Sequence, residues 1–150
     1  VVVNKWDLIP DKDANTAHDG QEHLIEKAPF LRYVPFIYIS SVTGQRVSKL
    51  PDMILEVAEA RKVRVGTSEV NKVLESLIER SAPPQKPGEE VKLLYASQIG
   101  TEPPVFAIVS NRPDDVPESY QRYLIHGFRS EWPFNGSPLR LKFTRRGSRD

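Results

Sequence analysis

The first part of the chain alternates apolar runs with helical patterns of hydrophobic residues. "VVVN" is typical of a short buried strand, and "VPFIYISS" is a second run rich in aromatic and β-branched residues. A helical cluster around Leu24 and Ile25 lies between these two runs. After the second run, apolar residues recur at helical spacing at Leu50, Met53, Ile54, Val57 and Ala58. This order of strand, helix, strand and helix predicts an α/β fold with a parallel sheet and right-handed crossovers.

Beyond Gly66 the pattern changes to that of a different domain. A Thr or Ser cap is expected to open a helix whose apolar face carries Val70, Val73, Leu74, Leu77 and Ile78. Two strand-like runs follow, "VKLLYASQIG" and "VFAIVSN". The prolines of the intervening "TEPP" exclude a continuing central strand and favour a connecting loop.

A second helix and a final strand complete this part of the chain. Large side chains recur at four-residue intervals, which predicts one buried helical face, at Tyr120, Leu124, Phe128 and Trp132. The segment "PLRLKF" alternates apolar residues with basic ones, as a half-buried strand does. The order helix, strand, strand, helix, strand therefore predicts an α+β domain, α-β-β-α-β.

Composition narrows the class of protein. With 150 residues, 39% of them hydrophobic and 27% charged, the chain suits one compact domain or two small ones. No stretch has the roughly 18 apolar residues of a membrane span, and the first residues do not resemble a signal peptide, so we expect no membrane partner and a cytoplasmic location. The absence of cysteine removes disulfides, thiolate metal sites and thiol nucleophiles. We expect no catalytic and no metal-ligating residues.

Positive charge collects at the end of the chain, although the formal net charge is only +1. The cations of this tail are Arg140, Lys142, Arg145, Arg146 and Arg149, and only Asp150 opposes them. Such a tail favours a polyanionic partner, but it also fits a segment that merely keeps the protein in solution. Arg140, Lys142, Arg145 and Arg146 are the candidate RNA contacts.

The segment "NKWD" follows the first apolar strand, where a ligand would meet the carboxyl end of a parallel sheet. The Asp7 carboxylate can accept hydrogen bonds from the ring N1–H and the amino group of guanine, an arrangement that adenine does not offer. Lys5 can lay its methylene stem along the base, and Asn4 can brace the loop or the purine edge. A polar turn that simply closes the strand is the alternative.

A second polar loop, "ISSVTGQRV", ends the next predicted strand. One intervening helix returns both loops to the same edge of the sheet, so Ser40 is expected near Asp7. Backbone N–H groups around Ser41 and Val42 can then reach the guanine carbonyl, which adenine replaces with a donor.

These segments resemble a known family. "NKWD" and "SSVTG" are similar to the fourth and fifth motifs of translation-factor-type P-loop GTPases. "TGQRV", "YASQIGTEPPVF", "SYQRYLIHGFR" and "FNGSPLRLKFTRR" together resemble the end of the Der (EngA) family of ribosome-assembly GTPases, which have two tandem G domains and a C-terminal KH-like module.

The resemblance implies a division of the chain and a function. Residues 1–64 would be the C-terminal part of the second G domain, with part of its parallel sheet. Residues 65–150 would be the KH-like domain with its basic tail. The implied ligand is GTP or GDP, bound here at its guanine end only, and the implied role is large ribosomal subunit biogenesis. The implied partners are the large ribosomal subunit or its rRNA, and the N-terminal G domains.

Some parts of such a protein are missing from this sequence. No G-x-x-x-x-G-K-[ST] loop is present to cradle phosphates, and no switch segment precedes "NKWD" to hold magnesium. The chain is therefore expected to read guanine without hydrolysing GTP by itself, with Mg²⁺ bound only in a full-length parent.

The KH-like part departs from nucleic-acid-binding KH domains as well, because it lacks the G-x-x-G loop that clamps a nucleic-acid backbone. RNA contact is thus expected from the basic strand and tail or from an aromatic face, and a purely interdomain docking role stays open. The rival hypothesis for the whole chain is a stand-alone RNA- or protein-binding module with no nucleotide role.

Overall fold

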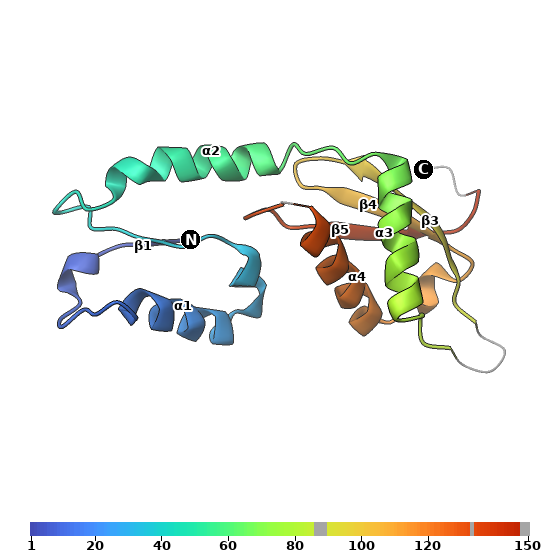
Figure 1. Cartoon of the computed structure of the whole chain (residues 1–150), viewed down its shortest axis with the longest axis horizontal. Coiled ribbons are helices and arrows are strands. Elements are labelled where there is room, and N and C mark those ends of the chain that lie inside the picture. The colour runs from blue at the N-terminus through green and yellow to red at the C-terminus, as the bar shows by residue number, and fades with distance from the viewer. Residues whose placement is uncertain (86–89, 133, 148–150) are drawn as a thin grey trace. The chain divides into compact units, whose positions relative to one another are not determined.

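The computed structural model describes residues 1–85, 90–132 and 134–147 (Figure 1). Arg149 and Asp150 of the predicted tail lie outside these residues. The chain forms two compact units, the first from Val1–Ala60 with Asn135–Ser137, and the second from the described residues of Arg61–Phe134 and Pro138–Asp150. Within the described ranges, none of the helices combines the length and the apolar character that crossing a bilayer requires.

The first unit has the predicted order of strand, helix, strand and helix. Its elements are β1 (Val2–Val3), α1 (Thr16–Lys27), β2 (Ile37–Tyr38) and α2 (Leu50–Ala60). The two strands pair in parallel, with Val2 opposite Ile37 and Val3 opposite Tyr38. Both strands are shorter than the apolar runs that predicted them, and no residue of α2 is buried.

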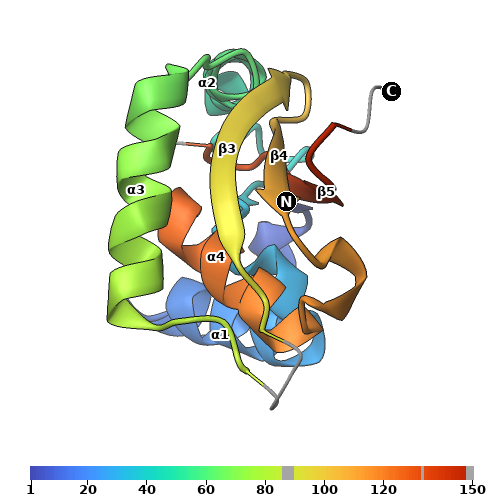
Figure 2. The ribbon, with the colours of Figure 1, turned by 90° about the vertical axis from the view of Figure 1, so that its right-hand side faces the viewer.

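The second unit has the predicted order of helix, strand, strand, helix and strand. Its elements are α3 (Thr67–Arg80), β3 (Leu93–Gly100), β4 (Val105–Ser110), α4 (Glu118–Glu131) and β5 (Arg140–Thr144). The strands form one sheet in the order β3-β4-β5, with β3 antiparallel and β5 parallel to β4. The helices α3 and α4 pack on one face of this sheet (Figure 2).

Aromatic side chains fill the core between helices and sheet. The ring of Phe106 on β4 lies 5.1 Å from that of Phe128, 5.5 Å from that of Trp132 and 5.9 Å from that of Phe134, measured between centroids. The predicted stripe of α4 is buried along its whole length, with Leu124 and Phe128 at zero exposure. Burial of these large apolar surfaces is the main source of stability in this unit.

The predicted Thr or Ser cap of α3 is wrong. Gly66 is the N-cap residue, in an extended conformation, and no side chain caps the helix. The chain before α3 is held by a buried side chain of β3 instead: Val65 N–H donates to Gln98 Oε1 at 2.7 Å, and Gln98 Nε2 donates to the Val63 carbonyl at 2.9 Å. This amide therefore fixes the chain that leads into the helix, although it does not cap the first-turn N–H groups.

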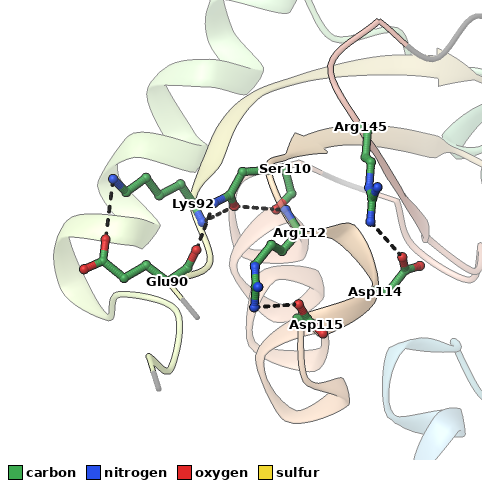
Figure 3. A network of polar contacts seen from close by, with 8 residues as sticks. Glu90, Lys92, Ser110, Arg112, Asp114, Asp115 and Arg145 are labelled. Atoms are coloured by element: carbon green, nitrogen blue, oxygen red, sulfur yellow. Dashed lines mark hydrogen bonds and ion pairs between the residues drawn. The ribbon is translucent and has the colours of Figure 1, made fainter. Parts of the chain in front are cut away.

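Two asparagines bind backbone groups of β3 and of the residues just before it. Asn71 on α3 accepts from Ala96 N–H at 2.8 Å and donates to the Ala96 carbonyl at 2.9 Å. Asn111 accepts from Lys92 N–H at 2.7 Å and donates to the Glu90 carbonyl at 2.8 Å, in the polar network of Figure 3. Each asparagine supplies the donor and the acceptor that a neighbouring strand would otherwise provide.

Two tyrosines of α4 donate hydrogen bonds to carbonyl groups at the end of α3. Tyr123 Oη donates to the Leu77 carbonyl and Tyr120 Oη to the Ser81 carbonyl, each at 2.7 Å. The Tyr120 hydroxyl supplies a donor to a carbonyl just beyond the helix, whereas the Leu77 carbonyl, which already accepts from Ser81 N–H at 3.0 Å, gains a second donor from Tyr123. Burial, and to a smaller extent the neighbouring Tyr123, raises the pKa of Tyr120 to about 12, so its hydroxyl stays a donor at neutral pH.

The two helices approach each other closely at Gly127. A Cβ atom built on Gly127 would lie 2.5 Å from Leu77 Cδ1, which is too close for a side chain that is only 4% exposed to avoid. Glycine normally weakens a helix interior by about 1 kcal/mol relative to alanine. Its presence in α4 is therefore explained by packing rather than by helix propensity.

We predict that Gly127→Ala lowers the free energy of unfolding by about 1–3 kcal/mol, because overpacking at Leu77 outweighs the gain in helix propensity. Urea denaturation followed by circular dichroism measures the change. The penalty should shrink in a Leu77→Ala background, where the added methyl group has room. A more stable Gly127→Ala protein would contradict the close helix contact.

Candidate nucleotide-binding site

The loops that follow β1 and β2 are joined by one asparagine. Asn4 Nδ2 donates to Ser41 Oγ at 3.1 Å, and Asn4 Oδ1 accepts from Ser41 N–H at 3.1 Å and from Lys5 N–H at 2.7 Å. The structure thus brings together the two loops that the sequence placed at the same edge of the sheet. The Asn4 side chain links them directly.

Lys5 has an unusual backbone conformation in the first loop. Its φ of 62° lies in the left-handed region, and it precedes the short 3₁₀ helix Trp6–Leu8. For a residue with a side chain this conformation costs about 1–2 kcal/mol. The bond from its N–H to Asn4 and the bond from Trp6 N–H to the Ile39 carbonyl, 2.9 Å long, hold the turn in place. The loop is therefore constrained by contacts on both sides of Lys5.

Trp6, the variable position of the motif, anchors this loop in the protein. Its side chain is 7% exposed and its ring lies 4.7 Å from that of Tyr38. Lys12 donates from Nζ to the Trp6 carbonyl at 2.6 Å and lies 5.4 Å from the centroid of the Trp6 ring. Sequence reasoning missed both residues, because Trp6 occupies a position that the motif leaves free and Lys12 belongs to a loop without periodicity.

The Asp7 carboxylate has an oxygen without a partner. Asp7 Oδ1 is shielded from solvent and accepts no hydrogen bond from the described residues. Interaction with the Ser40 side chain, and to a smaller extent the ammonium groups of Lys12 and Lys5, holds the pKa of Asp7 below its ordinary value, although desolvation acts in the opposite direction. An ionised, shielded carboxylate with an unused acceptor fits a ligand that presents N–H donors, as guanine does.

The residues of the loop after β2 differ in burial and in hydrogen-bond partners. Ser40 is fully buried and its Oγ accepts from Thr43 N–H at 3.1 Å, while the Val42 side chain is 85% exposed. Ser41 N–H is already engaged by Asn4. Among residues 41–43, Val42 N–H is the amide for which the described residues supply no acceptor. It is the donor best suited to a ligand carbonyl.

The candidate RNA contacts fall into two groups. Arg140 and Lys142 are exposed on β5, within the sheet of the second unit. Arg145 and Arg146 are exposed beyond the strand, and Arg145 Nη2 lies 3.7 Å from Asp114 Oδ2 (Figure 3). With side-chain exposures of 70% and 88%, this ion pair is weak and holds Arg145 only loosely.

The second unit, with its α-β-β-α-β order and helices on one face of a three-stranded sheet, is an α+β domain of the KH-like class. Residues 64–144 match the family model described as the KH-domain-like domain of EngA bacterial GTPase enzymes, C-terminal. The chain therefore belongs to the EngA family, also named GTPase Der, which confirms the family that the motifs indicated.

Several curated relatives carry the name GTPase Der. That of Gemmatimonas aurantiaca is 47% identical over 148 residues, which is 99% of this chain and 34% of the relative. That of Moorella thermoacetica is 42% identical over 97% of this chain and 33% of the relative, and that of a Synechococcus strain is 38% identical over 100% and 33%. The chain spans about a third of the length of the curated relatives it matches.

We predict that Asn4→Ala speeds hydrogen exchange at the Ser41 amide by about tenfold, because the acceptor for this N–H disappears and a lost hydrogen bond costs on the order of 1 kcal/mol. NMR-detected exchange measures it. Ser41→Ala is the matched control, since it removes only the hydroxyl and keeps the bond from the residue 41 amide to Asn4. Equal protection in the wild type and Asn4→Ala would show that Asn4 does not join the loops.

Proposed function

We propose that this chain is the guanine-reading and docking portion of a GTP-binding protein that acts in large ribosomal subunit biogenesis in the cytoplasm. Residues 1–64 are assigned to the C-terminal part of a P-loop GTPase domain, of which β1 and β2 contribute part of the parallel sheet. Residues 65–150 are assigned to the KH-like domain with its basic tail. The name of the relatives, GTPase Der, supports GTP or GDP as the ligand.

The observation that carries the nucleotide assignment is the unpartnered oxygen of Asp7. A shielded carboxylate oxygen without donors is costly in a folded protein, so its retention favours a role toward a ligand. Guanine offers two adjacent N–H donors in one plane, and a carboxylate accepts them with good geometry. Adenine presents no such pair. Rejection of adenine then follows from leaving Asp7 without partners.

The other residues of the site support Asp7 in this proposal. Asn4 holds the two loops together, Lys5 covers the base with its methylene stem, and the packing of Ser40 fixes the second loop. The amide of Val42, which has no partner among the described residues, is proposed to donate to the guanine carbonyl, while Ser41, whose N–H binds Asn4, is proposed to hold the loop in place. Contacts to the phosphates and to Mg²⁺ are assigned to other parts of the protein.

The KH-like domain is proposed to dock on RNA of the large ribosomal subunit through its cations. Arg140, Lys142, Arg145 and Arg146 are all exposed, so their charges are accessible to phosphates. The missing G-x-x-G loop argues against the backbone clamp of other KH domains. Docking on the G domains of the same protein is the competing role for this surface.

The test of guanine recognition uses a chimera in which the upstream portion of the Gemmatimonas aurantiaca relative precedes this chain. The chimera should bind GTP and reject ATP. Asp7→Asn should weaken GTP binding at least about a hundredfold and raise affinity for xanthosine triphosphate, whose 2-oxo group accepts from the new amide. Isothermal titration calorimetry measures all three nucleotides.

Asp11→Asn is the matched control for Asp7→Asn. Asp11 is exposed and has a φ of 47°, which asparagine adopts readily, so this substitution removes the same charge without disturbing the loop. It should leave nucleotide preference unchanged. A chimera that bound ATP as well as GTP would overturn the proposed guanine site.

We predict that replacing Arg140, Lys142, Arg145 and Arg146 with glutamine weakens binding to a short RNA and flattens its salt dependence. For single strands, the slope of log K against log salt changes by about 0.7 per phosphate contact, so about 3 is lost in total. Fluorescence anisotropy at several salt concentrations measures it. The charge-matched control replaces Lys27, Arg32, Lys49 and Lys72, which are exposed elsewhere. An unchanged slope would contradict the role of the basic tail.

A further inference from the structure

One face of the β3-β4-β5 sheet is not covered by the helices of its own unit. Ala96, Phe106 and Ile108 point toward α3 and α4 and are fully buried. Because side chains alternate along a strand, the residues between them point to the opposite face. This open sheet face is formed by Tyr95, Ser97 and Ile99 of β3, Val105, Ala107 and Val109 of β4, and Arg140, Lys142 and Thr144 of β5. Within it, Val109, which lies opposite Tyr95, is only 7% exposed.

The strand register orders these side chains across the open sheet face. Ser97 lies opposite Ala107, and Ala107 lies opposite Lys142, so small side chains separate the two edge strands. On the β3 edge, Tyr95 is 45% and Ile99 is 52% exposed, which is high for residues of this type within a sheet. The face therefore presents apolar surface along β3 and positive charge along β5.

The strands of this face carry no acidic side chain. The sequences of β3, β4 and β5 contain no aspartate or glutamate. The acids nearest to these strands in the network of Figure 3 are paired: Glu90 with Lys92 at 3.5 Å, and Asp114 with Arg145. Arg64 adds a cation at the β3 edge, where its Nη1 lies 3.5 Å from the Gln98 carbonyl. A polyanion is the partner that this distribution of charge fits.

We propose that the open sheet face binds single-stranded RNA, with one base stacked on Tyr95, a following base packed on Ile99, and phosphates bound by Arg140 and Lys142. Neighbouring strands lie about 4.8 Å apart, so β3 and β5 are separated by about 10 Å. Lys142 lies across the sheet from Ser97 and Arg140 lies across from Gly100, so a strand of RNA would run diagonally from Tyr95 toward these cations. This inference rests on the proposed RNA-docking role and deepens it by naming the surface and the form of RNA.

The same features argue against two other partners. A protein surface would be expected to need more apolar area than two exposed side chains beside a row of cations. Duplex RNA hides the faces of its bases, so Tyr95 would contribute nothing to binding it. Base stacking on an aromatic ring tolerates any sequence, so this face is expected to bind single strands with little base preference.

The test measures binding of the whole chain to a short mixed-sequence RNA, free and annealed to its complement, by fluorescence anisotropy. Tyr95→Ala should weaken single-strand binding about tenfold without changing the salt slope, because it removes stacking but no charge. Tyr95→Phe keeps the ring and should bind like the wild type. Arg140→Gln combined with Lys142→Gln should lower the slope by about 1.4.

Arg122→Gln is the matched control for charge, because Arg122 is exposed on α4, which covers the other face of the sheet. Circular dichroism confirms that each variant is folded.

If Tyr95→Ala binds single strands as the wild type does, or if the duplex binds equally well, the open sheet face is not a single-strand site. A loss of the salt slope in the β5 variants alone would keep RNA docking and discard stacking. Absence of RNA binding would overturn both, while the nucleotide test judges the guanine site separately.

Discussion

The structure of the second unit depends on how the backbone of one edge strand, β3, is satisfied. An edge strand presents N–H and carbonyl groups with no neighbouring strand, and buried groups of this kind must find partners. Asn71 supplies both to Ala96, and Gln98 binds the chain segment that leads into α3. These contacts fix α3 against β3, which in turn sets the position of its apolar face over the core. The edge is closed to another strand at the same time.

In the first unit, too, an amide side chain satisfies backbone groups of neighbouring segments. The Oδ1 atom of Asn4 accepts hydrogen bonds from the N–H groups of Lys5 and Ser41, and this holds the loops after β1 and β2 against each other. Because Asn4 satisfies the backbone, Asp7 is not required to do so, and its Oδ1 remains without a partner. Selectivity for a base requires such an unused acceptor in a fixed position. A loop that satisfied itself with Asp7 would be more stable and would have no acceptor left for a ligand.

Hydrophobic periodicity was sufficient to predict the order of elements and the buried stripe of α4, because burial is what periodicity reports. It could not predict how each element is held. The cap of α3 was assigned to a hydroxyl, whereas Gln98 from a distant strand fixes that position. The contacts of Lys12 to Trp6 and of Asp114 to Arg145 join residues without any common pattern. Pairwise polar contacts depend on tertiary structure, and a single sequence contains no periodic signal for them.

Packing also decides which surface of the KH-like domain is left for a ligand. The contact of Gly127 with Leu77 brings α3 and α4 close together, and the ring of Phe106 packs against Phe128 of α4. The helical side is therefore committed to the core, and without a G-x-x-G loop it has no backbone clamp. The opposite side of the sheet keeps an exposed aromatic ring, Tyr95, and the cations of β5. The absence of G-x-x-G and the uncovered sheet face are why the proposed RNA surface lies on the strands rather than on the helices.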